Sequence, residues 1–301
     1  MIKHGNNISG NGMTKDSIIK KIKSFPKLPV MFGDLLNHLN DPDVDLSKIA
    51  SEIKLDPGLT ANVLKLANSA MFGMARSIGS LEVAVVRLGI RNLFQMMMTQ
   101  GVSSRLNTRL DGYGVEPGDL LRHSIWTAVA AEGFATELKI GDQHMYYTAG
   151  LLHDIGRIII DEFAGPVIDK FVNEGKTGSM SFSDYETQQL GLSHAEAGAM
   201  VLDAWHFPPE LVEAVRWHHD PMSAGEFAAP ATMVHLADML SYSEGIGTGR
   251  DGLYHVVSTE ALTHFKLKTK IIEHIAGQTL EKMQEIERIL VGGGGRRGGG
   301  K

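Results

Sequence analysis

The chain contains no cysteine among its 301 residues. This absence excludes disulfide bonds, thiolate metal sites and cysteine nucleophiles, so any bound metal must be held by histidine, aspartate or glutamate. Such mixed nitrogen and oxygen ligand sets are typical of hydrolytic metal centres. The search for a functional site therefore turns to the histidines and the acidic residues.

The sequence also lacks an excess of positive charge and a long apolar run. Its formal net charge of −6 gives no electrostatic reason to expect binding to nucleic acid or to an anionic membrane. No apolar stretch approaches the roughly 20 residues that a membrane-spanning helix needs. Residues 1–13 are polar and lack the apolar core of a signal peptide. We therefore expect a soluble, cytoplasmic protein.

Strand-like alternation of apolar and polar residues is missing as well, whereas apolar residues recur at helical spacing along most of the chain. This pattern predicts an all-α fold. Helices are expected at 18–25, 30–39, 45–53, 57–67, 78–88, 90–102, 119–138, 143–162, 164–174, 182–190, 194–205, 208–218, 229–242 and 268–290.

A stretch rich in glycine and polar residues at 107–118 divides the predicted helices into two helical lobes. We expect a disordered leader at 1–13 and an N-terminal helical lobe at 14–112. A metal-binding helical lobe should follow at 113–290, and a flexible Gly/Arg tail at 291–301.

Histidines and aspartates recur in apolar surroundings in the second half of the chain. His153 and Asp154, for example, directly follow the apolar run from Ala149 to Leu152. A buried carboxylate without a partner is costly, so these contexts indicate that the side chains meet at a divalent cation. The predicted ligands are His123, His153, Asp154, His194, His218, His219 and Asp238, with Asp119, one helical turn before His123, as an auxiliary carboxylate.

An aspartate next to a histidine can bridge two metal ions, which together polarise a phosphoryl oxygen and activate a water molecule. Asp154 is therefore the predicted catalytic residue. Arg157 follows three residues later on the same helix face and is predicted to clamp a phosphate oxygen. As an alternative, Arg157 could pair with Asp161 on the helix surface.

Each of these side chains also has a plainer interpretation. A single buried histidine is more often a hydrogen-bonded core residue than a metal ligand. His153 and Asp154 could form a hydrogen bond at a helix end, and the pair at 218 and 219 could lie at an exposed helix terminus. The joint occurrence of seven such residues favours the metal. His235 is a weaker candidate for a place behind the ligands. The remaining histidines lack this context and are interpreted as structural or solvent-facing: His4, His38, His144, His206, His255, His264 and His274.

Two groups of motifs extend from about Leu28 to Tyr242. The first group is Leu28-Pro29, Asp56 to Thr60, Leu64 to Gly73, Ile78 to Ser80 and Ala84 to Gly89. The second group is Gly150 to Gly156, Glu186, Gly191 to His194, Gly198, Trp205 and His218-His219. On these motifs the chain resembles the HDOD family, a branch of the HD-domain superfamily of metal-dependent phosphohydrolases.

The resemblance implies an all-helical fold with an HD-like core in the second lobe and a role in bacterial signalling. Many HDOD proteins have lost the HD metal ligands, whereas this sequence keeps a set similar to that of the HD-GYP cyclic-di-GMP phosphodiesterases. The metals of those enzymes are often iron or manganese. We therefore expect two divalent ions, with iron or manganese favoured and zinc, nickel or magnesium as alternatives. The sequence departs from HD-GYP in lacking a Gly-Tyr-Pro motif after His219 and in carrying arginine instead of lysine at position 157.

Two hypotheses of function result. The first is a bacterial signalling protein whose di-metal site binds or hydrolyses a phosphorylated or nucleotide ligand, as a phosphomonoesterase or a phosphodiesterase. The second is a non-catalytic interaction module whose metal is structural and whose partner is a signalling protein. The complete ligand set favours the first, and the absent Gly-Tyr-Pro motif favours the second. Neither nucleic acid nor a membrane is an expected partner, and the oligomeric state stays open.

Overall fold

The structure is a computed structural model that describes residues 15–28, 32, 43–68, 78–174, 180–247 and 249–291. Across these ranges the regular structure is helical, without a β-strand and with one isolated bridge between Leu110 and Val115. The predicted all-α class is confirmed. The predictions for 1–13, 30–39 and 291–301 lie outside the described residues, except at Phe32 and Val291.

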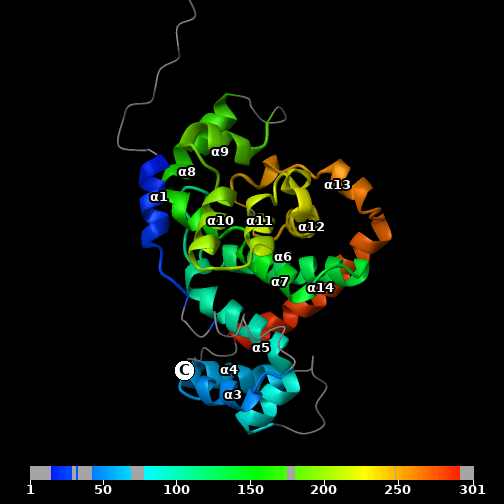
Figure 1. The fold of residues 1–301 in the computed structure, drawn as a ribbon. Coiled ribbons are helices and arrows are strands. Elements are labelled where there is room, and N and C mark those ends of the chain that lie inside the picture. Colours follow the sequence, from blue (N-terminus) through cyan, green and yellow to red (C-terminus); the bar gives the residue numbers. More distant parts are fainter. Residues whose placement is uncertain are drawn as a thin grey trace, which may run out of the picture.

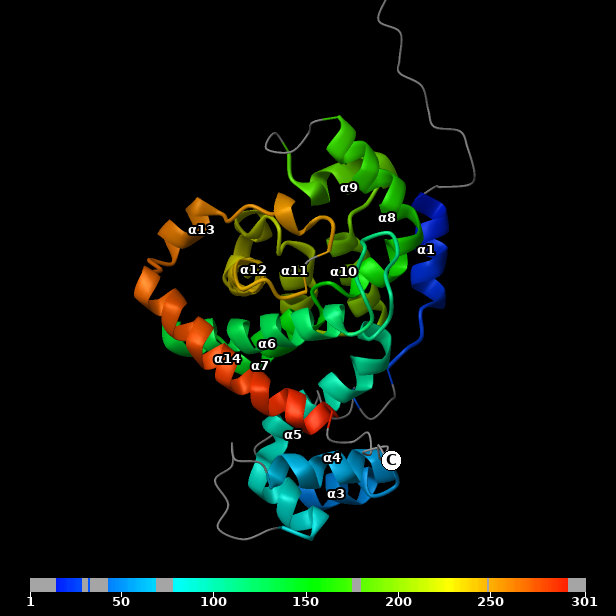
Figure 2. The same ribbon diagram turned by 180° about the vertical axis from the view of Figure 1, so that it is seen from behind.

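The helices divide between two lobes in Figures 1 and 2. The helices of the first part of the chain are α1 (Lys15–Ser24), α3 (Leu46–Ile53), α4 (Pro57–Ala67), α5 (Leu81–Leu106), α6 (Asp119–Leu138), α7 (Gln143–Leu152) and α8 (Ile155–Asn173). The later ones are α9 (Phe182–Leu190), α10 (His194–Ala204), α11 (Pro209–Arg216), η2 (Pro221–Phe227), α12 (Ala228–Ser243), η3 (Gly252–Tyr254), α13 (Thr259–His264) and α14 (Thr269–Val291).

The small lobe consists of α3, α4 and residues 81–88 of α5, at the bottom of Figure 1. Its helices begin at side-chain caps: Asp45, Asp56 and Ser80 each accept a hydrogen bond from a backbone N–H in the first turn. Such caps satisfy N–H groups that have no partner inside the helix. Between the helices lies an apolar core that includes the fully buried Ile53 and Val63.

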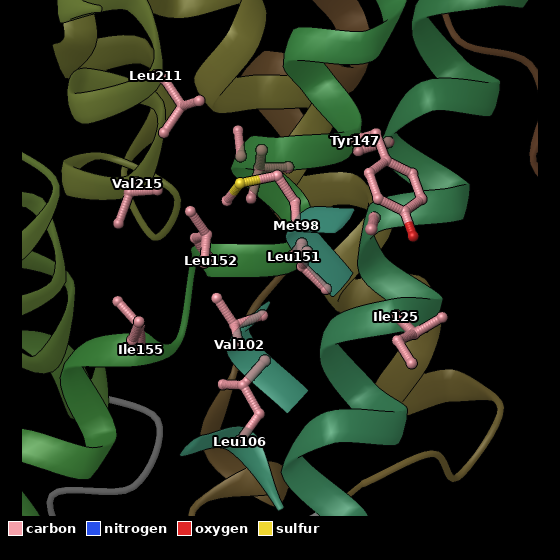
Figure 3. Close-up of a cluster of buried hydrophobic side chains, with 14 of the residues drawn as sticks. Met98, Val102, Leu106, Ile125, Tyr147, Leu151, Leu152, Ile155, Leu211 and Val215 are labelled. Carbon is pink, nitrogen blue, oxygen red and sulfur yellow. The ribbon is translucent and has the colours of Figure 1, made fainter. Parts of the chain in front are cut away.

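Helix α5 passes from the small lobe into the rest of the molecule, which we call the large lobe. It kinks at Gly89, whose φ of 72° is in the left-handed region that favours glycine. The two helices predicted at 78–88 and 90–102 meet at this kink. Beyond it, α5 contributes to the core shown in Figure 3, whose labelled side chains are Met98, Val102, Leu106, Ile125, Tyr147, Leu151, Leu152, Ile155, Leu211 and Val215.

The large lobe is built around α6, which packs against α7, α12 and α14. In Figure 2, the long C-terminal helix α14 runs across α6 and ends beside α5. Helix α1 packs on α8 and α10, so it joins the large lobe in space although the sequence groups it with the N-terminal lobe. Its Ile18 and Ile22 are buried and belong to the same apolar core as residues of α8 and α10. No described helix has the length and apolar character needed to cross a bilayer.

The structure differs from the helix predictions in one place that matters for function. The single helix predicted at 143–162 is split, because α7 ends at Leu152 and α8 begins at Ile155. His153 and Asp154 therefore occupy a corner between two helices and not a continuous helix face. Helix α8 then continues to Asn173, past residue 163, where the sequence predicted a break between two helices. It includes Pro166, because a proline removes a single N–H donor and buried side chains on both sides of it keep the helix packed.

Candidate metal centre

The predicted ligands reach one point in the large lobe from five places in the chain. His123 projects from the first half of α6, and His153 and Asp154 from the corner between α7 and α8. The other three positions are His194 at the start of α10, His218-His219 just after α11, and Asp238 in α12. All are buried except His219, which is partly exposed.

Close packing of α8 on α10 brings two of these places together. Gly156 lies so near α10 that a Cβ at this position would be 1.9 Å from the carbonyl oxygen of His194 and 2.5 Å from the backbone nitrogen of Gly198. Only glycine fits such an approach. As a result, Nε2 of His194 lies 3.5 Å from Oδ1 of Asp154.

The first group of donors, which we call subsite 1, consists of His123, His153, Asp238 and Oδ2 of Asp154. Nε2 of His123 lies 3.1 Å from Nε2 of His153, 3.1 Å from Oδ1 of Asp238 and 3.4 Å from Oδ2 of Asp154. Nε2 of His153 lies 3.4 and 3.5 Å from the same two oxygens. Donors about 2.1 Å from one ion stand about 3.0–3.4 Å apart in octahedral or tetrahedral geometry. Subsite 1 therefore has the spacing of a metal site.

The second group, subsite 2, consists of His194, His218, His219 and the other carboxylate oxygen of Asp154. Nε2 of His194 lies 2.8 Å from Nε2 of His219, and Nε2 of His218 lies 4.0 Å from Oδ1 of Asp154. The three imidazoles offer donor atoms within 4.8 Å of one another. Asp154 thus faces subsite 1 with Oδ2 and subsite 2 with Oδ1, the arrangement of a carboxylate that bridges two ions.

Backbone carbonyl groups hold the rings of three histidines. Nδ1 of His153 donates to the carbonyl of Gly150 and Nδ1 of His218 to that of Val215, both at 2.7 Å. For His123, Nδ1 faces Oγ of Ser241 at 2.9 Å, and that hydroxyl donates to the carbonyl of Asp238. A carbonyl only accepts, so Nδ1 must carry the proton and a neutral ring keeps its lone pair on Nε2. In the neutral form of these rings, all three lone pairs therefore point into the centre.

A carboxylate performs the same task for His194. Oε2 of Glu186 accepts hydrogen bonds from Nδ1 of His194 at 2.5 Å and from its backbone N–H at 3.0 Å. The other oxygen, Oε1, accepts from the hydroxyl of Tyr113 at 2.5 Å. Carboxylate–histidine pairs of this kind fix the tautomer of a ligand and raise its basicity. The sequence motifs included Glu186 but assigned it no role, and no sequence pattern pointed to Tyr113 as part of the site.

Two buried carboxylates at the centre lack hydrogen bonds altogether. Both oxygens of Asp154 and both of Asp238 have no hydrogen-bond partner, and neither does Nε2 of His218. Burial opposes ionisation of Asp154, but the charges of Arg157 and His153 outweigh it and hold the pKa of that carboxyl well below its usual range. Buried anions without hydrogen bonds need a countercharge. These oxygens and this imidazole nitrogen are the kinds of atom that coordinate divalent metal ions.

The imidazoles of subsite 2 are suited to the same role. Burial, reinforced by neighbouring histidines, holds the pKa of His218 and of His219 well below the usual value. Both rings are therefore neutral near pH 7 and keep the lone pair that a metal ligand needs. In subsite 1, burial acts to lower the pKa of His153, but the carboxylates of Asp154 and Asp238 together outweigh it and raise the pKa to about 10. A metal ion must displace that proton.

Arg157 is enclosed at the centre and contacts three groups at once. Nε lies 2.7 Å from Oδ2 of Asp154, Nη1 lies 2.8 Å from Oδ2 of Asp251, and Nη2 donates to the hydroxyl of Tyr242 at 3.0 Å. The guanidinium also lies over the ring of Tyr113. The alternative pairing with Asp161 is wrong, because that carboxylate instead accepts hydrogen bonds from backbone N–H groups at 112 and 113.

Asp119 is the one predicted ligand that the structure leaves outside the centre. It is exposed at the first residue of α6 and is absent from every group of converging donors among the described residues. Gly247 packs between this helix end and the rest of the lobe: a Cβ there would lie 2.4 Å from Cβ of His123 and 2.9 Å from the carbonyl oxygen of Asp119. Gly247 therefore packs closely against both His123 and the backbone of Asp119.

Two histidines outside the ligand set have clear places. His235 donates from Nδ1 to the carbonyl of His218 at 2.7 Å and accepts at Nε2 from the backbone N–H of Ser258. It therefore positions the residue that precedes His219. His255, set aside at the sequence level, stacks between Tyr242 and His219 and lies 3.2 Å from Asp251. Asp251 and His255 come from an irregular segment, and their spacing of four residues was the sole hint of their pairing.

Two curated proteins are similar in sequence to most of this chain. An uncharacterized protein of Treponema pallidum is 27% identical over 277 residues, which are 90% of this chain and 52% of that protein. Ribonuclease Y of Thermus thermophilus is 28% identical over 252 residues, 81% of this chain and 37% of the enzyme. The chain thus spans about half or less of the length of these curated relatives.

A solved structure supports the fold assignment. The crystal structure of an HDOD domain protein of unknown function from Geobacter sulfurreducens superposes with a TM-score of 0.69 at 24% identity, covering 91% of this chain and 98% of that one. The sequence pattern of the HDOD domain matches residues 25–221, which include six of the seven converging ligands. The chain therefore belongs to the HDOD family.

Proposed function

We propose that this protein is a metal-dependent phosphoester hydrolase of bacterial signalling, acting on a small phosphorylated or nucleotide ligand. The observation that carries the proposal is the pair of subsites that share Asp154, with Oδ2 toward subsite 1 and Oδ1 toward subsite 2. Two ions held side by side by one carboxylate are the usual apparatus of phosphoester hydrolysis. A His/Asp donor set accepts several first-row metals, and the family resemblance favours iron or manganese among them.

The bound ions would supply the Lewis acid that polarises a phosphoryl oxygen. The residues of the chain prepare that chemistry. Asp154 bridges the subsites, and Arg157 holds the carboxylate of Asp154 ionised and oriented. Glu186 and the carbonyl groups behind His153 and His218 keep the imidazole lone pairs directed inward. We assign Arg157 a positioning role, because its nitrogens already contact Asp154, Asp251 and Tyr242.

A small substrate suits this site better than a polynucleotide. The name of ribonuclease Y says that this relative cleaves RNA. The present chain, however, carries a net charge of −6, which disfavours binding to a polyanion. Most donors of the centre are buried, and His219 is the partly exposed one. A phosphate group on a small molecule can enter there without a long charged groove.

The proposal is tested by metal analysis together with phosphoesterase assays. Protein purified without chelator should contain at least one equivalent of Fe, Mn or Zn, and Mn²⁺-loaded protein should hydrolyse p-nitrophenyl phosphate or its bis-ester. Asp154→Asn should lose bound metal and lower turnover at least about 1,000-fold, since it removes a ligand of both ions. Asp119→Asn, at the exposed start of α6, is the matched control and should retain both. A metal-free wild-type protein, or full turnover in Asp154→Asn, contradicts the proposal.

A second candidate is a non-catalytic module in which the metal cross-links α6, α8, α10 and α12 and another surface binds a signalling protein. The favouring observation is that Arg157, the sole buried arginine or lysine in the described part of the chain, already contacts the carboxylates of Asp154 and Asp251. In this case chelation should lower the melting temperature while neither ester is hydrolysed with any metal. Turnover that depends on Asp154 would exclude the module as the whole function.

A further inference from the structure

The large lobe contains a cavity that is separate from the candidate metal centre. It has a volume of about 720 Å³ and lies between α5, the first turns of α7, the start of α11 and the junction of η2 with α12. Residues from 142 to 148 line it at the start of α7, whereas His153 and Asp154 follow the other end of that helix. None of the described residues that line the cavity belongs to subsite 1 or subsite 2. Its volume is typical of sites for small molecules.

The wall of the cavity is apolar and largely aromatic. Its buried members include Phe94, Tyr146, Phe207 and Leu211, and Phe227 adds a partly exposed ring. The faces of such rings carry partial negative charge, so they attract cations as well as flat apolar groups. The wall therefore suits a ligand with an aromatic or aliphatic body.

Three carboxylates give the cavity a negative charge. Asp142, Glu210 and Glu226 line it, and no lysine or arginine is among the described residues that do so. Asp142 is already engaged, because its Oδ1 accepts from the backbone N–H of His144 at 3.2 Å and lies 3.5 Å from Nη1 of Arg91. Glu210 and Glu226 are exposed, so their carboxylates are the ones that a ligand from solution can meet.

The carboxylate of Glu210 lies close to the aromatic wall. Burial and the charge of Glu210 together raise the pKa of the Tyr146 hydroxyl. Gly141 packs on the same hydroxyl, since a Cβ at this position would lie 2.7 Å from that oxygen. This close packing fixes the ring of Tyr146 in the wall. An ammonium group between this ring and Glu210 would be attracted by both.

We infer that this cavity is a binding site for a small organic cation, whose apolar body contacts the aromatic wall and whose ammonium group faces Glu210 and Glu226. An anion would be repelled by the same two carboxylates. The inference does not rest on the proposed function, because the cavity shares no residue with the metal subsites. A ligand in the cavity would lie against α7 and α11, the helices that lead to His153 and His218.

Two probes with the same indole body test this inference on the full chain. Tryptamine carries an ammonium group, and tryptophol carries a neutral hydroxyl in its place. Equilibrium dialysis is performed at pH 8, where an ordinary histidine is neutral and an alkyl amine stays protonated. We expect one equivalent of tryptamine to bind at least about tenfold more tightly than tryptophol, and this difference should shrink in 1 M NaCl. Equal affinities for the two probes, or no saturable binding of tryptamine, overturn the inference.

Substitution of the two exposed glutamates tests the role of charge. The double variant Glu210→Gln, Glu226→Gln should bind tryptamine at least about fivefold more weakly and tryptophol as before, because only the negative charge is lost. Glu273→Gln, at an exposed position of α14 outside the cavity, is the matched control and should bind both probes like the wild type. Undiminished binding of tryptamine to the double variant rejects the cavity as its site.

Two further variants test the wall itself. Phe227→Ala removes a ring and should weaken the binding of both probes by a similar factor, of at least about five. His206 also lines the cavity, and its φ of 62° is in the left-handed region that favours glycine. His206→Gly should therefore keep or raise the melting temperature while both probes bind more weakly, so that misfolding cannot explain the loss. Unchanged binding of both probes to these two variants contradicts the inference.

Discussion

The two lobes bury different kinds of side chain. The small lobe has an apolar core, with Ile53 and Val63 fully buried, and its ion pair between Lys54 and Glu82 is on the surface. The large lobe has an apolar core too, but it also encloses Asp154, Asp238 and their charged neighbours. Burying charge reduces stability unless something compensates. The small lobe thus buries apolar side chains alone, whereas the large lobe also buries the charged side chains of the candidate metal centre, and the following experiments test that difference.

The largest effect on stability should come from breaking the buried ion pair behind the centre. Asp251→Asn leaves the guanidinium of Arg157 without one of its partners, and we expect the free energy of unfolding of metal-free protein to fall by about 4 kcal/mol at pH 7. Asp169→Asn, which breaks the exposed pair with Arg250, is the matched control and should cost under about 1 kcal/mol. Equal losses in urea unfolding would remove the distinction between buried and exposed pairs.

The same pair predicts a dependence on pH. Burial opposes ionisation of Asp251, but the charge of Arg157 and the contact with His255 together outweigh it and lower the pKa to about 2, against about 4 in an unfolded chain. A carboxyl whose folded pKa is depressed stabilises the protein above the unfolded pKa and loses that effect as the pH falls through the folded one. The difference between wild type and Asp251→Asn should therefore shrink from pH 4 to pH 2. A constant difference over this range contradicts the assignment.

In the small lobe, a truncated core side chain should affect stability alone. Ile53→Ala should lower the free energy of unfolding by about 3 kcal/mol, because it leaves a cavity beneath α4 and α5. Metal content should be unchanged, since no charged group of the centre lies nearby. Leu55→Ala, at a side chain that is 85% exposed, serves as the control and should match the wild type. Loss of metal from folded Ile53→Ala would show that the lobes are coupled.

A smaller effect is expected behind subsite 2. Glu186→Gln keeps the shape of the side chain but weakens its hold on Nδ1 of His194, and the affinity for metal should fall about 10–100-fold. Glu174→Gln is a close control, because Glu174 likewise accepts from a tyrosine hydroxyl, that of Tyr185, without touching a ligand. Titration calorimetry with Mn²⁺ measures both. Unchanged metal affinity in Glu186→Gln would show that the carboxylate of Glu186 only fills space in the core and does not position His194.

The smallest effect should be at the surface of the small lobe. The side chains of Lys54 and Glu82 are 64% and 51% exposed, and their contact is screened by water and salt. Replacing both by glutamine should shift the melting temperature by no more than about 1 °C and leave metal content unchanged. A larger shift would mean that the small lobe, too, depends on charge.

Much of the fold could be predicted because local signals determine it. Asp45 and Asp56 cap helices at the starts that the sequence predicted, and Gly89 separates two helical segments as expected. The helix predicted from Ile78 begins only at Leu81, because Ser80 caps it. The split between α7 and α8 could not be predicted, since apolar periodicity continues through His153 and Asp154. That corner forms because Gly156 allows α8 to approach α10, which is a contact between residues far apart in sequence.

The sequence by itself determined which residues belong to the candidate metal centre. Histidine and aspartate in apolar contexts indicated His123, His153, Asp154, His194, His218, His219 and Asp238, because burial of such groups requires a common partner. Only the tertiary structure decided how these residues are arranged. It divided the ligands into two subsites, left Asp119 in solvent and turned Arg157 toward Asp251. Helix rotation and the course of the irregular segment around Asp251 set these contacts, and neither leaves a periodic signal in the sequence.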